Sequence, residues 1–170
     1  SLAKEIDRCI LSEEEIADDA SNGLRSVRRA MKTAAEKIRT QLNSLVVNSR
    51  TYLQDGVITM RNGRYCVPVK AEHKSNVPGM VHDQSSSGST IFVEPLSVVK
   101  LNNELRELEI REQKEIEAVL AALSNQTCDH LDELTLDLEL IGELDFIFAK
   151  AALSRHYRGC EPRLNKDGII

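Results

Sequence analysis

The chain has 170 residues, of which 41% are hydrophobic and 29% charged, which fits a soluble, folded protein. Its net charge of −5 argues against a generic binder of polyanions. Aromatic residues make up only 4% and there is no Trp, whereas compact enzyme cores usually contain more large rings. The composition therefore favours long helices that pack in thin layers.

The cysteines and the apolar runs predict a cytoplasmic protein. The four cysteines are widely spaced and form no Cys-x-x-Cys pair, so we expect reduced thiols and no zinc site. The first residues lack the apolar core of a signal peptide, and no apolar run approaches the length of a membrane span. We therefore expect no membrane contact.

Charge is distributed unevenly along the chain. Residues 21–55 contain seven basic and two acidic residues, a net charge of +5. Residues 1–20 carry two basic and seven acidic residues, a net charge of −5, and residues 98–160 carry seven basic and thirteen acidic residues, a net charge of −6. A basic stretch between acidic ones is more informative than the total, because it indicates one contacting surface.

Residues 13–50 are predicted to be helical, with Asp18, Asp19 or Ser21 capping a helix that starts near Asn22. Apolar residues recur at spacings of three and four, the pattern of a helical seam. No Gly or Pro interrupts residues 24–55, so we expect a long arm. The seam consists of Leu24, Val27, Met31, Ala34, Ile38, Leu42 and Leu45.

After residue 55 the helical spacing of apolar residues ends, and residues 56–95 are predicted to form an antiparallel patch of β-strands. Asn62-Gly63 is a typical hairpin turn, and Pro68 suggests an edge strand or a bulge. Serines and Gly88 occupy a second turn. The expected strands are 57–60, 65–69, 79–83 and 90–93.

Two further helices follow. The first, at about 98–124 with Ser97 as its cap, has an outer face dense in Glu, Lys and Arg. The second, at about 130–157, is apolar on two sides, which predicts burial against more than one neighbour. The fold class is therefore mainly α with a small antiparallel β insertion, in which long antiparallel helices flank a β tip.

Three stretches of sequence are distinctive. They are RYCVPVKAE at 64–72, GMVHDQSSSGSTIFVEP at 79–95 and LNNEL at 101–105. Together they resemble the MutS-like ATPases of the second bacterial branch, paralogues linked to suppression of recombination and to rescue of stalled ribosomes. Residues 18–21, 53–55 and 144–151 resemble the same family, so the resemblance covers nearly the whole chain. Cys66 departs from it mildly, since we expect a β-branched residue there.

The resemblance implies a domain plan. Residues 1–55 would be the first core and lever helices, 56–97 a clamp-like tip, and 98–158 the returning lever and core helices. Residues 159–170 would lead to an ATPase domain that binds ATP and magnesium. The family's Gly-x-x-x-x-Gly-Lys-Ser/Thr loop and its endonuclease domain are absent from this sequence, so no catalytic residue and no cofactor can be assigned here. The resemblance also implies a homodimer.

Two groups of basic residues are candidates for contact with DNA or ribosomal RNA. The tip cations are Arg61, Arg64, Lys70 and Lys74. The shaft cations, which share one face of the first long helix, are Arg25, Arg28, Arg29 and Lys32. The alternative for the shaft cations is a solvated face, or ion pairs with the acidic helix at 98–124.

Catalytic and metal sites are less favoured. His82, Asp83 and the serines at 85–87 contain the residue types of a nucleophilic triad, but neighbours along a strand point to opposite faces. We expect a turn there, with a phosphate or subunit contact as the alternative. His73 and His82 with Glu72 or Glu94 match no common metal-ligand spacing.

The sequence thus favours a lever with a clamp-like tip that couples nucleotide-driven motion to a grip on DNA or the ribosome. A rival interpretation is a homodimer-assembly module that contacts no nucleic acid. A free-standing enzyme is disfavoured, because no convergent catalytic site is evident.

Overall fold

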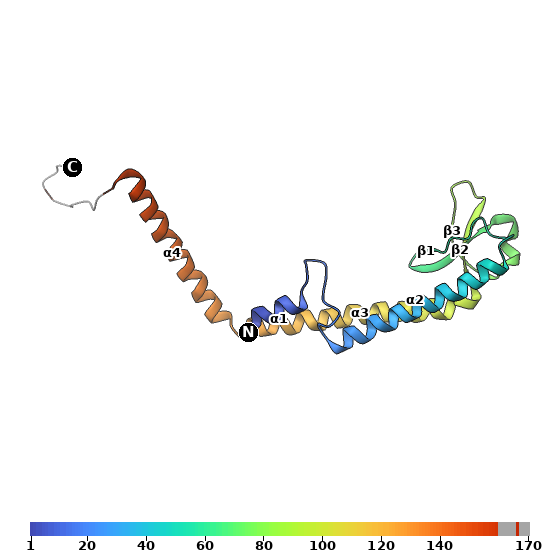
Figure 1. The fold of residues 1–170 in the computed structure, drawn as a ribbon, viewed down its shortest axis with the longest axis horizontal. Helices are drawn as coiled ribbons and strands as arrows, with labels where there is room; N and C mark the ends of the chain where they lie inside the picture. Colours follow the sequence, from blue (N-terminus) through green and yellow to red (C-terminus); the bar gives the residue numbers. More distant parts are fainter. Residues whose placement is uncertain (160–165, 167–170) are drawn as a thin grey trace. The chain divides into compact units, whose positions relative to one another are not determined.

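The computed structural model describes residues 1–159 and 166. These residues divide into two compact units, with the division between residues 123 and 124. Each unit is considered by itself. The first unit contains a helical pair and a small sheet, and the second contains one long helix (Figure 1). The predicted fold class, mainly helical with a small antiparallel β insertion, is confirmed.

Helices α2 (Asn22–Asn48) and α3 (Leu96–Cys128) run side by side in opposite directions (Figure 1). Ser21 caps α2, because its hydroxyl accepts a hydrogen bond of 2.9 Å from the Leu24 amide. The predicted seam is buried at five of its positions, and Met31 and Leu45 pack beside it. The buried seam residues are Leu24, Val27, Ala34, Ile38 and Leu42.

The sheet has four antiparallel strands in the order β1-β2-β4-β3. The hairpin turn between β1 and β2 contains Asn62 and Gly63, whose φ angles are 51° and 72°, as the Asn-Gly sequence predicts. The strands are β1 (Thr59–Arg61), β2 (Arg64–Lys70), β3 (Gly79–Gln84) and β4 (Thr90–Pro95).

Pro68 lies in β2, which is flanked by β1 and β4, so the predicted edge strand is wrong. The Pro68 carbonyl accepts from the Gln54 amide at 3.0 Å, and the Lys70 amide donates to the Tyr52 carbonyl at 3.0 Å. These backbone groups face away from β4, because both groups of a strand residue point to the same side. The N–H that proline lacks would therefore have faced the irregular segment 52–54, and no bond to β4 is lost.

The prediction of helix for residues 13–21 is wrong. The helix lies earlier, as α1 (Leu2–Cys9), and the chain then folds back through a bond of 2.8 Å from the Ala17 amide to the Cys9 carbonyl. Cys9 is buried in a small cluster with Val119 and Leu123 of α3. Burial of this cluster favours the fold-back over continued helix.

Two further details differ from prediction. A short 3₁₀ helix, η1 (Ala71–Asn76), connects β2 and β3. Helix α3 begins directly after β4, so Ser97 lies inside the helix and does not cap it. The Leu96 amide instead donates to the Pro78 carbonyl at 3.0 Å, which satisfies one of the free amides at the helix start.

The second unit contains the end of α3 and the helix α4 (Leu131–Tyr157), which lies close to its predicted bounds. None of its residues is buried, so the predicted burial is not found among the residues that the structure describes. Of the helices within residues 1–159, none has the length and apolar content needed to cross a membrane. Most of the predicted linker at 159–170 lies outside the described residues.

Gly79 is predicted to be intolerant of any side chain. A Cβ at this position would overlap the carbonyl group of Glu94 in the neighbouring strand and crowd Val93. Gly79→Ala should therefore lower the free energy of unfolding of the first unit by about 1–3 kcal/mol. In Gly56→Ala, the added Cβ meets only a Val46 methyl at 3.4 Å.

Urea unfolding followed by circular dichroism compares the two variants. The Gly56 variant serves as the control and should unfold within about 0.5 kcal/mol of the unmodified chain. Equal stability of both variants would show that β3 and β4 are not as closely apposed as described.

Candidate nucleic-acid interface

A buried carboxylate connects the sheet to α3. Glu94 of β4 is 0% exposed. Its Oε1 accepts hydrogen bonds from Arg64 at 3.1 Å and from Asn102 at 2.8 Å, and its Oε2 lies 2.5 Å from His82 Nε2. These residues come from β2, α3 and β3, so one side chain joins four elements. We call Glu94, Arg64, His82 and Asn102 the Glu94 joint.

Asn102 makes the connection to the helix specific. It is 1% exposed, and its amide nitrogen donates to the Tyr65 carbonyl at 3.2 Å while its oxygen accepts from the Tyr65 amide at 3.2 Å. The side chain thus bonds to β2 as a neighbouring strand would. Because every one of these groups is buried and paired, removal of one partner would leave the others unsatisfied.

Two of the tip cations hold the sheet together. Arg64 belongs to the Glu94 joint. The guanidinium of Arg61 lies 4.0 Å from the centre of the Phe92 ring, and its Nε lies 3.0 Å from Asp83. Asn62 beside it donates to the His82 carbonyl at 3.1 Å. The β1–β2 turn therefore reaches the bulge in β3, and these cations have structural partners.

The other two tip cations are less constrained. The Lys70 ammonium donates to the Thr51 carbonyl at 3.2 Å and has no acidic partner among the described residues. Lys74 is exposed on η1, and within residues 1–159 it has neither a hydrogen bond nor an ion pair. A cation without a partner in the chain can neutralise a phosphate without breaking an existing pair.

The shaft cations divide in the same way. Arg28 bonds to Glu112 of α3 at 2.7 Å and also to Asp18. Partial burial acts to lower the pKa of Arg28, but these two carboxylates outweigh it and raise the pKa. Arg25 lies 3.7 Å from Asp19. The alternative of ion pairing with the acidic helix is thus found for Arg28.

Arg29 and Lys32 remain exposed on α2, without ion-pair partners among the residues described. The structure therefore leaves three of the eight candidate cations, Lys74, Arg29 and Lys32, without a partner in the described chain. They lie on two elements, η1 and α2.

The serine-rich segment forms the predicted turn. Ser85 accepts from the Thr90 amide at 3.1 Å, Asp83 accepts from the Gln84 amide at 2.8 Å, and Gly88 has a φ of 73°. His82 faces Glu94, away from these hydroxyls. In the described part of the chain, no three His, Cys, Asp or Glu side chains lie close enough to hold a metal ion.

The thiols are free at Cys9, Cys66 and Cys128. Burial, assisted by the nearby Glu94 carboxylate, raises the pKa of Cys66 to about 11. Cys66 is therefore an inert part of the sheet interior. Cys160 lies outside the described residues.

The sequence did not reveal the Glu94 joint, although its residues fall within the distinctive stretches. Those stretches place a His before a turn, a Glu after it and an Asn in the following helix. A buried charge needs partners from other elements. This need of a buried Glu for partners was the signal in the sequence that could have linked the His, the Glu and the Asn.

Removal of the central carboxylate should be costly. Glu94→Ala leaves Arg64 and Asn102 without their acceptor, and we expect the free energy of unfolding to fall by about 3–5 kcal/mol. Glu72→Ala is the matched control, because the Glu72 side chain is 76% exposed. It should change stability by less than about 0.5 kcal/mol.

The measurement is urea unfolding, combined with hydrogen exchange of the Tyr65 amide. Exchange at Tyr65 should accelerate in the Glu94 variant and stay slow in the control. A Glu94 variant as stable as the control would contradict the assignment of the joint.

Comparison with known proteins gives the family context. No family model matches the chain. The chain is 59% identical over its whole length to a protein named Endonuclease MutS2 from Agathobacter rectalis and 56% identical to one from Lachnospira eligens. It is 46% identical to Endonuclease MutS2 from Caldanaerobacter subterraneus subsp. tengcongensis, again over 100% of the chain.

In each case the chain spans 22% of the relative's length. The similarity concerns a segment of these proteins, and it includes the three distinctive stretches that carried the resemblance. The predicted resemblance is confirmed, and the chain corresponds to a segment of the relatives named Endonuclease MutS2.

Proposed function

We propose that this chain is the non-catalytic lever and clamp-like part of a MutS-like ATPase that binds DNA or the ribosome. In this proposal the chain couples nucleotide-driven motion elsewhere in the polypeptide to a grip on nucleic acid. The full-length protein would suppress homologous recombination or rescue stalled ribosomes in the cytoplasm. It would act as a homodimer. It would also carry an endonuclease domain, in keeping with the name of its relatives.

The Glu94 joint is the observation that carries this proposal. A lever transmits motion only if its tip cannot rotate freely on its arm. Asn102 holds α3 to the backbone of β2, and Glu94 holds both to β3 and β4. Displacement of the helical pair would therefore move the sheet with it.

Nucleotide binding would belong to another part of the full-length protein. The sequence contains no Gly-x-x-x-x-Gly-Lys-Ser/Thr loop, and the described residues offer no cluster suited to magnesium. In this proposal ATP and magnesium bind elsewhere in the full-length protein. The residues of this chain would supply rigidity and charge.

In the proposed grip, the cations near the sheet contribute more to binding than the cations along α2. Lys70 and Lys74 have no acidic partner in the described chain and lie at or near η1. Arg29 and Lys32 lie along α2. Backbone phosphates need only cations at suitable spacing, and the sheet end is where a clamp would reach a duplex.

The proposal predicts that the tip matters more than the shaft. Lys70→Ala with Lys74→Ala should weaken binding to duplex DNA or to structured ribosomal RNA. The slope of log affinity against log salt should also fall by about 0.7–0.9 for each phosphate that the variant no longer neutralises. The matched control is Arg29→Ala with Lys32→Ala, which removes the same number of charges from α2.

Affinity is measured by fluorescence anisotropy across a series of salt concentrations, both for this chain and for the full-length protein. Helix content should stay unchanged, because neither pair of residues lies in the buried seam. A greater decrease in affinity for the shaft variant would contradict the clamp assignment. Unchanged affinity in both variants would contradict the proposed contact with nucleic acid.

One observation favours a second candidate function, homodimer assembly. Helix α4 exposes many large apolar side chains, and such surfaces are often protein interfaces. Sedimentation velocity over a range of concentrations tests this candidate. Homodimer assembly would be supported if the chain forms reversible dimers and the double variant Leu138→Glu with Ile141→Glu does not. A monomer at every concentration would contradict it.

A further inference from the structure

A row of three valines crosses the sheet, and the valine at the sheet edge is partly exposed to solvent. Val67 pairs with Val93, and Val93 pairs with Val81, so the three side chains lie on one face. Val67 is 0% exposed and Val93 is 1% exposed, because this face forms the core of the first unit. Val81, on the same face at the sheet edge, is 41% exposed.

The backbone at this edge is also open. Pro78 bonds toward Leu96, so the residues that alternate with it, Gly79 and Val81, turn their N–H and C=O groups away from β4. Within residues 1–159 no other segment bonds to these groups. Exposed strand edges are commonly blocked by Lys or Pro, but Gly79 and Val81 offer no such block.

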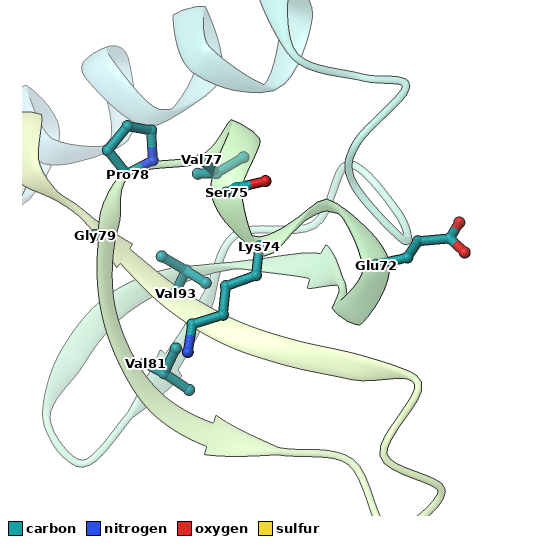
Figure 2. Close-up of a pocket in the computed structure, with 8 residues that line it drawn as sticks. All are labelled: Glu72, Lys74, Ser75, Val77, Pro78, Gly79, Val81 and Val93. Atoms are coloured by element: carbon teal, nitrogen blue, oxygen red, sulfur yellow. The ribbon is translucent and has the colours of Figure 1, made fainter.

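A pocket of about 440 Å³ lies between η1 and this edge. Val77, Val81 and Val93 contribute its apolar wall. Figure 2 shows the Lys74 side chain extending toward Val81, whereas Glu72 points away from it. The pocket therefore combines an apolar surface with a cation that has no acidic partner among the described residues.

We propose that the edge of β3 at Gly79 and Val81 binds an extended peptide segment of a partner protein, with an apolar side chain beside Val81 and a carboxylate facing Lys74. The segment adds as a further antiparallel or parallel strand and bonds to the open groups of Gly79 and Val81. Side chains two residues apart share a face, so the carboxylate lies two positions from the apolar residue. The site shares Lys74 with the proposed grip on nucleic acid, whereas the open edge of β3 takes no part in that grip.

Charge selects this partner over a second copy of the chain. In an edge-to-edge pair of copies, β3 would present Gly79, Val81 and Gln84 on the face that carries Lys74. None of these residues supplies a carboxylate. The bulge between Val81 and Asp83 limits the open edge to a short stretch, which suits a short linear segment.

The test is a nuclear magnetic resonance titration of the whole chain with two synthetic peptides, both acetylated and amidated at their ends. The first is Glu-Thr-Val-Thr-Glu, and the second is Lys-Thr-Val-Thr-Lys. The first should shift the amide resonances of Gly79 and Val81 to saturation. The second should leave them unchanged at the same concentration.

Two variants separate the charge from the backbone. Lys74→Glu should weaken binding of the acidic peptide about fivefold and allow the basic peptide to bind. Lys100→Glu, on the exposed surface of α3, is the matched control and should change neither. Val81→Pro removes the open N–H of residue 81 and should abolish binding of the acidic peptide.

Three outcomes would overturn the proposal. One is the absence of saturable shifts with the acidic peptide. Another is equal binding of the two peptides in the unmodified chain. The third is a shift of Gly79 and Val81 that follows the concentration of the chain alone, which would assign the edge to a second copy.

Discussion

The rest of the first unit depends on one buried carboxylate. Glu94 has no exposed surface, so its charge must be compensated within the protein, and Arg64, His82 and Asn102 do so. A buried charge is costly unless its partners are held in place. The orientation of β2, β3 and β4 on the start of α3 is therefore specified by this joint as well as by apolar contact.

This constraint changes how the basic residues are understood. The sequence offers eight cations, in two groups, as candidates for contact with nucleic acid. Arg61, Arg64 and Arg28 instead have structural partners, whereas Arg29, Lys32 and Lys74 have none in the described chain. The cations that stabilise the fold are therefore distinct from those available to a partner.

The regular elements could be predicted because their signals are local. The spacing of three and four from Leu24 to Leu42 predicts α2, and Asn62-Gly63 predicts the hairpin, since one helix face or one turn suffices for each. The joint could not be predicted from such patterns. Its partners lie 8 to 30 residues from Glu94 and meet only through the tertiary fold. The fold-back after α1 likewise depends on burial of Cys9 against α3.

In the proposed lever, the Glu94 joint makes the sheet and α3 one rigid body. Spin labels at Met80 on β3 and Glu107 on α3, with Cys128 and Cys160 replaced by serine, give the distance distribution between them by double electron–electron resonance. We expect one narrow distribution for the unmodified joint and a broad one in Glu94→Ala, even where far-ultraviolet circular dichroism shows that the helices persist. Distributions of equal width in the two proteins would contradict it.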